Sequence, residues 1–303
     1  MARVVCVGIS VFDYVFTVDR LPEAQVKHYA RGRLEVTGGI AANAARAVAR
    51  LGGEATLVSR IGDDLAGRAV RADLAAEGID TSALHALAGA RTSLSAVIID
   101  PSGERMLVND TDPRVLRGLD GVPPAAFEGA DAVLADTRWA DGARLAMAAA
   151  RERGVPGVLD FDRVPDHGGT EDLLTLASHV VFGRQGLAAL AGTEDVGAGL
   201  RFARDAAGPA AWLAVTAGAE GAYRLDGAGE VRHLPGFMVA SVDTLAAGDV
   251  FHAAFALALA EGRPEVEAAR FGNAAAALKC TRPGGGAGAP LRREVDEFLG
   301  ERG

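Results

Sequence analysis

Asp249 stands in the stretch DTLAAGDVFHAAFALALAEG (243–262), where small residues precede a single carboxylate at the start of an apolar helical pattern. A helix N-terminus offers unpaired N–H groups and a partial positive charge, and Ala246, Ala247 and Gly248 would let a phosphate approach that backbone closely. Asp249 could then accept a proton from a hydroxyl while the N–H groups stabilise charge on a transferring group. Alternatively, Asp249 only complements the helix dipole, because aspartate is common in first turns.

Two further stretches contain glycines that could hold phosphates, VTAGAEGAY after an apolar run and CTRPGGGAGAP after a helical pattern. Taken singly, the first is equally a tight turn and the second a plain loop. The chain has no G-x-x-x-x-G-K-[ST] sequence and no G-x-G-x-x-G after its first strand, which argues against a P-loop or a dinucleotide site. The residues concerned are Thr216, Gly218, Gly221, Gly284 and Gly285.

The elements that must position these residues alternate between strand and helix. RVVCVGIS (3–10) is a short apolar run that predicts a buried parallel strand, and GGIAANAARAVARLGG (38–53) predicts a helix that ends at glycine. Further strands are predicted at 54–62, 131–136, 155–160, 179–182 and 211–216, and further helices at 65–79, 141–153, 170–177, 196–206, 248–261, 265–279 and 292–299. This order predicts an α/β fold, a doubly wound, mostly parallel sheet with helices on both faces, which binds ligands at the carboxyl ends of its strands.

Residues 12–36 and 91–109 break that rhythm, because they alternate polar and apolar residues and contain hairpin turns such as DPSGER. They predict a small β-sheet lid over the main domain or a β interface with another subunit. No linker, repeat or low-complexity tract interrupts the sequence, so residues 1–303 are expected to form one domain.

The composition excludes several classes of protein. The chain has 303 residues, 49% of them hydrophobic and 23% charged, which is typical of a soluble protein with a large core. No apolar run is long enough to span a membrane, and the N-terminus does not resemble a secretion signal. Cys6 and Cys280 are expected to be buried thiols in a reducing compartment, which predicts a cytoplasmic location. The net charge of −9 without a basic stripe argues against nucleic acid, and an anionic substrate would need a local positive pocket.

Taken together, GGIAANAARAVARLGG and DTLAAGDVFHAAFALALA resemble the two signatures of the ribokinase-like (phosphofructokinase-B-type) sugar kinases. IGDD, VTAGAEGAY and the glycine-rich loop follow in the same order, so the resemblance covers essentially the whole chain. It implies an ATP-dependent phosphotransferase that uses Mg²⁺, with a β lid that closes over the sugar and often forms a homodimer interface.

The resemblance also implies roles for individual residues. Asp249 corresponds to the catalytic base, and Ala246 to Gly248 correspond to the anion hole, where Ala246 replaces the usual glycine. A methyl group is tolerable there if φ is negative. The other implied positions are Asp13, Gly39 and Asn43 for sugar hydroxyls; Thr216, Gly218 and Gly221 for nucleotide phosphates; Gly284 and Gly285 for the nucleotide; Asn273 beside the adenine pocket; and Asp243 and Thr244 near a monovalent-cation site that holds K⁺ in some relatives.

One departure concerns the metal. Relatives commonly carry Asn-x-x-Glu after a mid-chain strand, where it supports Mg²⁺ through water. The corresponding residues 183–186 read GRQG and contain no carboxylate, so the protein contacts to Mg²⁺ stay unassigned.

Finer features, LADTRWADGAR (134–144), GERMLVND (103–110) and ALKCTRPGGGAG (277–288), most resemble family members that phosphorylate the C1 hydroxyl of 6-deoxy-6-sulfofructose during sulfoquinovose degradation. That resemblance implies that Lys27, Asn109 and Arg138 hold the sulfonate. A sulfonate is a monoanion with three acceptor oxygens, and charge-assisted bonds from Lys and Arg suit it.

Several alternatives stay open. Lys27 is otherwise a solvated lid residue and Arg138 a surface charge. The substrate is otherwise another small sugar, a sugar phosphate such as fructose 6-phosphate, or a nucleoside. A non-catalytic sugar-binding regulator built on a kinase fold is the alternative from a different class.

Overall fold

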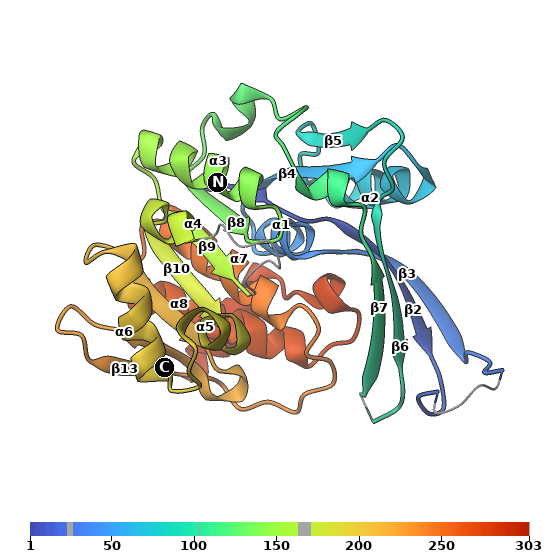
Figure 1. The fold of residues 1–303 in the computed structure, drawn as a ribbon. Helices are drawn as coiled ribbons and strands as arrows, with labels where there is room; N and C mark the ends of the chain where they lie inside the picture. Colours follow the sequence, from blue (N-terminus) through green and yellow to red (C-terminus); the bar gives the residue numbers. More distant parts are fainter. Residues whose placement is uncertain (23–26, 103, 163–170, 303) are drawn as a thin grey trace.

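The computed structural model describes residues 1–22, 27–102, 104–162 and 171–302. Its main sheet contains β1 (Arg3–Val7), β4 (Glu54–Gly62), β5 (Leu84–Leu87), β8 (Ala132–Asp136), β9 (Gly157–Phe161), β10 (His179–Gly183), β11 (Trp212–Thr216), β12 (Gly221–Leu225) and β13 (Val231–Pro235). The nine strands run in the order β13-β12-β11-β10-β9-β8-β1-β4-β5 (Figure 1). All neighbours are parallel except the pairs β11–β12 and β12–β13 at one edge.

Helices cover both faces of this sheet. They are α1 (Ile40–Arg50), α2 (Leu65–Ala76), α3 (Ala140–Arg153), α4 (Glu171–Leu176), α5 (Arg184–Ala191), α6 (Val196–Ala207), α7 (Ala247–Ala260), α8 (Glu265–Cys280) and α9 (Arg292–Gly300). In β1, Val4 and Cys6 pack into the core beneath α1, α7 and α8, whereas Val5 and Val7 pack into the core beneath α3 and α6. The doubly wound sheet predicted from the alternating elements is confirmed, and no helix of the described chain is long and apolar enough to cross a membrane.

The structure differs from the predicted elements in a few places. The strand predicted at 3–10 ends at Val7, because Gly8 turns the chain at a φ of 148° toward the second sheet. β5, α5, β12 and β13 were not predicted, since each is only four to eight residues long and carries too short a pattern. The helix predicted at 170–177 is α4, and residue 170 lies outside the described residues.

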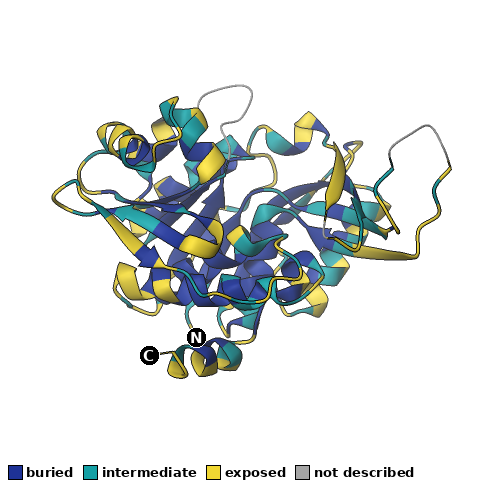
Figure 2. Cartoon of the chain, turned by 90° about the horizontal axis from the view of Figure 1, so that it is seen from below, coloured by how far each residue is buried: buried dark blue, intermediate teal, exposed yellow. Residues whose placement is uncertain are grey.

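The second sheet is the predicted β lid. It consists of β2 (Val11–Thr17), β3 (Gly32–Gly38), β6 (Ser93–Ile99) and β7 (Arg105–Asp110), in the order β3-β2-β6-β7. These strands correspond to the predicted segments 12–36 and 91–109, but β2 begins one residue earlier, β3 extends to Gly38 and β7 extends to Asp110. Residues 23–26 and 103 of the predicted segments lie outside the described residues. Figure 2 shows the main sheet buried between its helices, whereas much of the lid is exposed.

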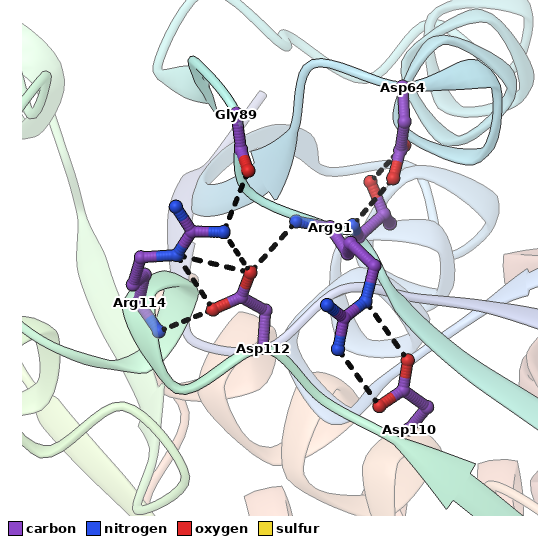
Figure 3. A network of polar contacts seen from close by, with 7 residues as sticks. Asp64, Gly89, Arg91, Asp110, Asp112 and Arg114 are labelled. Carbon is purple, nitrogen blue, oxygen red and sulfur yellow. Dashed lines mark hydrogen bonds and ion pairs between the residues drawn. The ribbon is translucent and has the colours of Figure 1, made fainter.

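A polar network fixes the base of the lid where β6 and β7 meet the main domain (Figure 3). The carboxylate of Asp64 accepts hydrogen bonds from the N–H and hydroxyl of Thr92, next to the start of β6, and from Gly67 N–H at the start of α2. Asp112, just beyond β7, accepts from Arg91 N–H at 3.0 Å and pairs with Arg114. Hydrogen bonds from Arg114 and Arg91 lower the pKa of Asp112, so this anchor is a permanent anion near neutral pH.

The order of the strands predicts where a ligand would bind. β1 and β8 are neighbours, and the chain continues from β1 to β4 on one side of this pair and from β8 to β9 on the other. In an open α/β sheet, the crevice at the carboxyl ends of such strands is where ligands bind. The lid leaves the main domain at this point, directly after β1.

Candidate active site

The N-terminus of α7 opens into a cleft at the carboxyl ends of the strands. The helix is held rigidly, because the residues from Val250 to Leu259 are buried among α1, α8 and the sheet. Beside its first turn lies a cavity of about 150 Å³. Its lining residues are Ile40, Asp160, Asp162, Gly183, Thr216, Gly248, Asp249 and His252. The structure therefore brings Gly248, Asp249 and Thr216, predicted from separate motifs, to one cavity.

The backbone at Ala246 differs from the expectation. Ala246 has a φ of 63° and a ψ of 12°, which is the left-handed region, and it precedes the first residue of α7, Ala247. The condition of a negative φ, under which a methyl group would be tolerable at this position, is therefore not met. A left-handed alanine costs about 1–2 kcal/mol, and such strain persists where the surrounding structure enforces it.

We expect Ala246→Gly to raise the free energy of unfolding by about 1 kcal/mol, because glycine adopts this φ without the clash of a Cβ atom. Urea denaturation with an unchanged m-value measures the gain. Gly248→Ala is a suitable control, since a Cβ atom there meets no neighbour within 4 Å and Gly248 lies inside the helix. A loss of stability in Ala246→Gly would contradict the assigned backbone conformation.

Asp249 is held by Asn43 on α1. Asn43 Nδ2 donates a hydrogen bond to Asp249 Oδ2 at 2.7 Å, which joins two residues that are 206 positions apart. Burial and the nearby Asp160 carboxylate raise the pKa of Asp249 to about 7, although the Asn43 bond lowers it. A carboxyl group whose pKa lies close to neutrality suits a general base. Asn43 Oδ1 is buried and lacks a hydrogen-bond partner among the described residues.

The cavity also contains three residues that the sequence reasoning missed. Asp160 and Asp162 lie at the carboxyl end of β9, and His252 lies one turn after Asp249 on α7. His252 Nδ1 lies 3.0 Å from Asp160 Oδ2 and 2.7 Å from the carbonyl oxygen of Gly248. Burial lowers the pKa of His252, and its contacts with Asp160 and Gly248 tie the end of β9 to the start of α7. The Asp-x-Asp sequence at the end of a predicted parallel strand was the signal that could have found the pair.

Arg138 lies just beyond β8 on the same side of the sheet. Its guanidinium donates to Asp162, one of the cavity residues, and its Nε atom is buried and has no partner among the described residues. Its backbone N–H donates to Asp136 Oδ1 at 2.9 Å. Arg138 is therefore paired with a cavity residue, and its contact with a ligand stays a prediction.

Asp136 connects this strand end to the lid. Its other oxygen accepts from Ile9 N–H at 2.8 Å, at the point where the chain leaves β1 for β2. Burial raises the pKa of Asp136 to about 6, against the hydrogen bonds from Ile9 and Arg138 that lower it. A Cβ atom on Gly8 would lie 1.9 Å from Asp136 Oδ2, so this close approach requires glycine.

Asp13 and Asn109 share one face of the lid. Asp13 pairs with Ser95 in the register of β2 and β6, and Ser95 pairs with Asn109 in β6 and β7, so their side chains point to the same side. The carboxylate of Asp13 packs against Gly38, where a Cβ atom would lie 2.0 Å from Asp13 Oδ2. Burial raises the pKa of Asp13, against a hydrogen bond from Ser95. Gly39, at a φ of 94°, caps α1 and approaches Ile9, so no side chain fits there.

Lys27 is not brought to this row of residues. It is exposed in the connection between β2 and β3 and makes no hydrogen bond or ion pair with another described residue. Its predicted contact with a ligand stays a prediction, and it would need the lid to close or the connection to fold inward.

Around the predicted nucleotide region, Gly218 is open at a φ of 59°, and a Cβ atom there meets nothing within 4 Å. Gly221 is different, because a Cβ atom would lie 2.3 Å from the backbone of β13. Asn273 on α8 donates from Nδ2 to the carbonyl oxygens of Leu234 and Pro235 at 3.1 and 3.0 Å. Gly221 and Asn273 thus hold the antiparallel edge in place, and their contacts with a nucleotide stay predictions.

The residues predicted near a monovalent cation do not fit K⁺. Lys279 Nζ lies 2.7 Å from the carbonyl oxygen of Asp243 and 3.0 Å from its Oδ2 atom, so an ammonium already occupies these oxygens. Leu245 N–H and Gly285 N–H donate to the same carboxylate at 2.8 and 3.1 Å. Thr244 is exposed, and its carbonyl oxygen accepts from Ala247 N–H.

The glycine-rich loop packs on this arrangement and on the catalytic residues. Gly284 has a φ of 98° and Gly285 a φ of 55°, which the following short turn requires. A Cβ atom on Gly286 would lie 2.2 Å from Asn43 Oδ1, so glycine lets the loop approach Asn43. Gly286 was not among the predicted site residues.

The carboxylates of the cavity suit a divalent metal better than the absence of the Asn-x-x-Glu motif suggested. In residues 183–186, where the resemblance implies Asn-x-x-Glu, Gly186 stands in the place of the carboxylate, and Arg184 pairs with Glu220 at 2.8 Å. Burial, and after it the neighbouring Asp162 and Asp136 carboxylates, raise the pKa of Asp160 well above its usual range. No three His, Cys, Asp or Glu residues of the described chain form a complete metal site. Mg²⁺ in phosphoryl transfer needs only one or two carboxylates besides phosphate oxygens, and Asp160 and Asp162 could supply them.

Comparison with known proteins identifies the family. The profile of the pfkB family carbohydrate kinases matches residues 1–292. The chain is a pfkB-family carbohydrate kinase. It is 33% identical to the ATP-dependent ribose-1-phosphate kinase of Halopiger xanaduensis over 100% of this chain and 99% of that one. It is also 33% identical to a fructokinase of Klebsiella pneumoniae, over 87% of this chain and 88% of that one.

Solved structures agree with this assignment. A protein of Agrobacterium tumefaciens superposes on the kinase with a TM-score of 0.94 at 39% identity, over 99% of this chain and 98% of that one. The fructokinase of Xylella fastidiosa, whose structure contains ATP, superposes with a TM-score of 0.81 at 25% identity, over 99% of this chain and 98% of that one. The ribokinase-like fold is confirmed, and the protein is an ATP-dependent kinase that acts on a sugar hydroxyl.

Proposed function

We propose that this kinase transfers the γ-phosphoryl group of ATP to the C1 hydroxyl of 6-deoxy-6-sulfofructose, giving the 1-phosphate. The observation that carries the proposal is Arg138, whose buried Nε donor lacks a partner and whose guanidinium is joined to the cavity residue Asp162. A buried donor without a partner costs free energy, so an anionic ligand oxygen would relieve that cost.

The local charge favours a monoanion over a dianion. Asp162 neutralises much of the charge on Arg138, and Asp136 and Asp160 lie close by. A sulfonate carries one negative charge, whereas a sugar phosphate carries nearly two near neutral pH and would be repelled more strongly by the Asp162 carboxylate. Asn109, in register with Asp13 on the lid, would supply a neutral donor, and Lys27 would add a cation from the connection between β2 and β3.

The chain's own residues would then perform the transfer. Asn43 orients Asp249, which takes the proton of the C1 hydroxyl. The C1 oxygen attacks the γ-phosphorus, and the bond between the γ-phosphorus and the bridging oxygen of the β-phosphate breaks. The backbone N–H groups at the start of α7 stabilise the charge that spreads over the transferring group. Mg²⁺, with Asp160 and Asp162 as its proposed protein contacts, would supply neutralisation of the phosphate oxygens.

A sugar phosphate is the second candidate. It is favoured by the identity of 33% with the ribose-1-phosphate kinase, over the whole of this chain. Both candidate substrates need an anion site. They differ in the negative charge that this site must accept, and the phosphoryl transfer is the same for both.

A substrate panel tests the proposal. We expect 6-deoxy-6-sulfofructose to give a higher kcat/KM than fructose 6-phosphate, ribose 1-phosphate, fructose, ribose or a nucleoside, in an assay of ADP release. Arg138→Ala should lower kcat/KM for the sulfosugar roughly ten- to a hundredfold, because it removes charge-assisted bonds. Arg293→Ala, which removes an exposed arginine paired with Glu297 on α9, is the matched control.

The other outcomes of the panel decide between the alternatives. A higher kcat/KM for a sugar phosphate, or an unchanged preference in Arg138→Ala, would overturn the sulfosugar assignment. If no sugar of the panel causes ADP release, the sulfosugar assignment is also overturned, and the substrate of the kinase lies outside the panel. We also propose a homodimer formed through the lid, which is supported by four exposed apolar lid residues, Leu34, Met106, Leu107 and Val108. Sedimentation in solution tests it, and the cytoplasmic location stays a prediction.

A further inference from the structure

The ammonium group of Lys279 has an unusual position in the kinase. The residue lies near the end of α8, its side chain is 0% exposed, and its Nζ atom contacts both the carbonyl oxygen and the carboxylate of Asp243. Removing an ammonium from water costs several kcal/mol, which only close oxygen partners offset. An apolar side chain of the same length would avoid that cost, so the positive charge itself must serve a purpose at this place.

The composition of the chain supports a specific need for lysine. Among 31 lysines and arginines, lysine occurs only at positions 27 and 279. An ammonium is a compact point charge with three donors, whereas the guanidinium of arginine is a planar fork that needs more room. Two oxygens of Asp243 lie at 2.7 and 3.0 Å from Nζ, and they provide a site for a small cation rather than for a planar guanidinium group.

The oxygens that Lys279 holds control the geometry of the anion hole. The Asp243 carboxylate also accepts from Leu245 N–H, next to the strained Ala246, and from Gly285 N–H in the glycine-rich loop. Gly286 in turn packs against Asn43, the partner of Asp249. One buried charge therefore neutralises the carboxylate that joins the two loops around the start of α7.

We propose that Lys279 is a built-in replacement for a bound monovalent cation. Its ammonium group takes the oxygen ligands of Asp243, fixes the loop from 243 to 246 against Gly285, and makes the kinase independent of K⁺. Lys279 is a positioning residue, because it acts on the anion hole through Asp243 and touches no reacting atom. The inference rests on the kinase activity of the family and not on the identity of the sugar.

Activity in different salts tests the inference, with whichever sugar of the panel is turned over. We expect the wild-type enzyme to show the same kcat with tetramethylammonium, Na⁺ or K⁺ as the monovalent cation. Lys279→Ala should lose roughly tenfold or more in kcat without K⁺, because Asp243 is left uncompensated, and K⁺ or NH₄⁺ should restore part of it. Arg270→Met, which removes an exposed cation on the same helix, should respond to no cation.

A second measurement needs no substrate. K⁺ should raise the Tm of Lys279→Ala relative to tetramethylammonium at equal ionic strength, since a ligand that binds the folded state stabilises it, and should leave the Tm of the wild type unchanged. Stimulation of the wild type by K⁺ would overturn the inference, even if the variant fails to fold. So would a folded Lys279→Ala that keeps full activity, or one that loses activity and gains neither kcat nor Tm from K⁺ or NH₄⁺.

Discussion

Asp249→Asn lowers kcat by at least about a thousandfold while the KM for ATP changes little, because the amide cannot accept the hydroxyl proton but fills the same space. The expected loss of kcat exceeds that of the other substitutions. Asp249 is the carboxylate at the start of α7, and it accepts a hydrogen bond from the Asn43 amide. Steady-state kinetics on the sugar and on ATP measure it. Near-normal turnover would show that another group is the base.

The pH profile provides the control for this substitution. The pKa of Asp249 is raised to about 7, so below that pH the carboxyl group is protonated and can no longer take a proton. We therefore expect kcat/KM of the wild type to fall about tenfold per pH unit on the acid side of neutrality. The residual activity of Asp249→Asn should lack this limb. If the activity of the wild type and of Asp249→Asn falls at acid pH with the same midpoint, the titration belongs to another group.

The same raised pKa affects stability in the opposite direction. The folded protein binds this proton more tightly than the unfolded chain, whose carboxyl group has a pKa near 3.8. The contribution of Asp249 to stability therefore increases as the pH falls from about 7 toward about 4. A fall in pH below about 7 thus lowers the activity and raises the contribution of Asp249 to stability.

Gly8→Ala destabilises the kinase by about 3 kcal/mol and abolishes most of its activity. The added Cβ atom would lie 1.9 Å from the Asp136 carboxylate, and a φ of 148° is a conformation that alanine rarely adopts. Displacing Asp136 would also disturb its bonds to Ile9, where the lid begins, and to Arg138. Urea denaturation and kcat/KM measure the two effects.

Gly78→Ala is the matched control for Gly8→Ala. Gly78 also has a positive φ, 79°, but a Cβ atom there meets nothing within 4 Å. It should lose only about 1–2 kcal/mol, from backbone strain alone, and keep its activity. Equal losses of stability and activity in the two variants would show that the contact between Gly8 and Asp136 has no role beyond the backbone.

The sequence determined the type of fold and the class of enzyme, and it placed the predicted catalytic residues along the chain. Apolar runs of strand length alternate with helical patterns, and that periodicity predicts the sheet because burial of apolar faces is local information. The pairing of a small-residue helix start with Asp249, and the resemblance of two signatures, were sufficient to predict a sugar kinase. Short elements such as β5 and α5 escaped prediction, since few residues carry too weak a pattern.

Only the tertiary structure decided which charges meet. Asp160, Asp162 and His252 reach the cavity from distant parts of the chain, and the pKa values of Asp160 and His252 depend on burial and on neighbouring carboxylates, which no local pattern encodes. The positive φ of Ala246 and the ammonium of Lys279 on Asp243 likewise arise from contacts between distant segments. Spacing along a chain determines the periodicity of its elements, whereas electrostatic interaction depends on distances in space, and these exist only once the chain is folded.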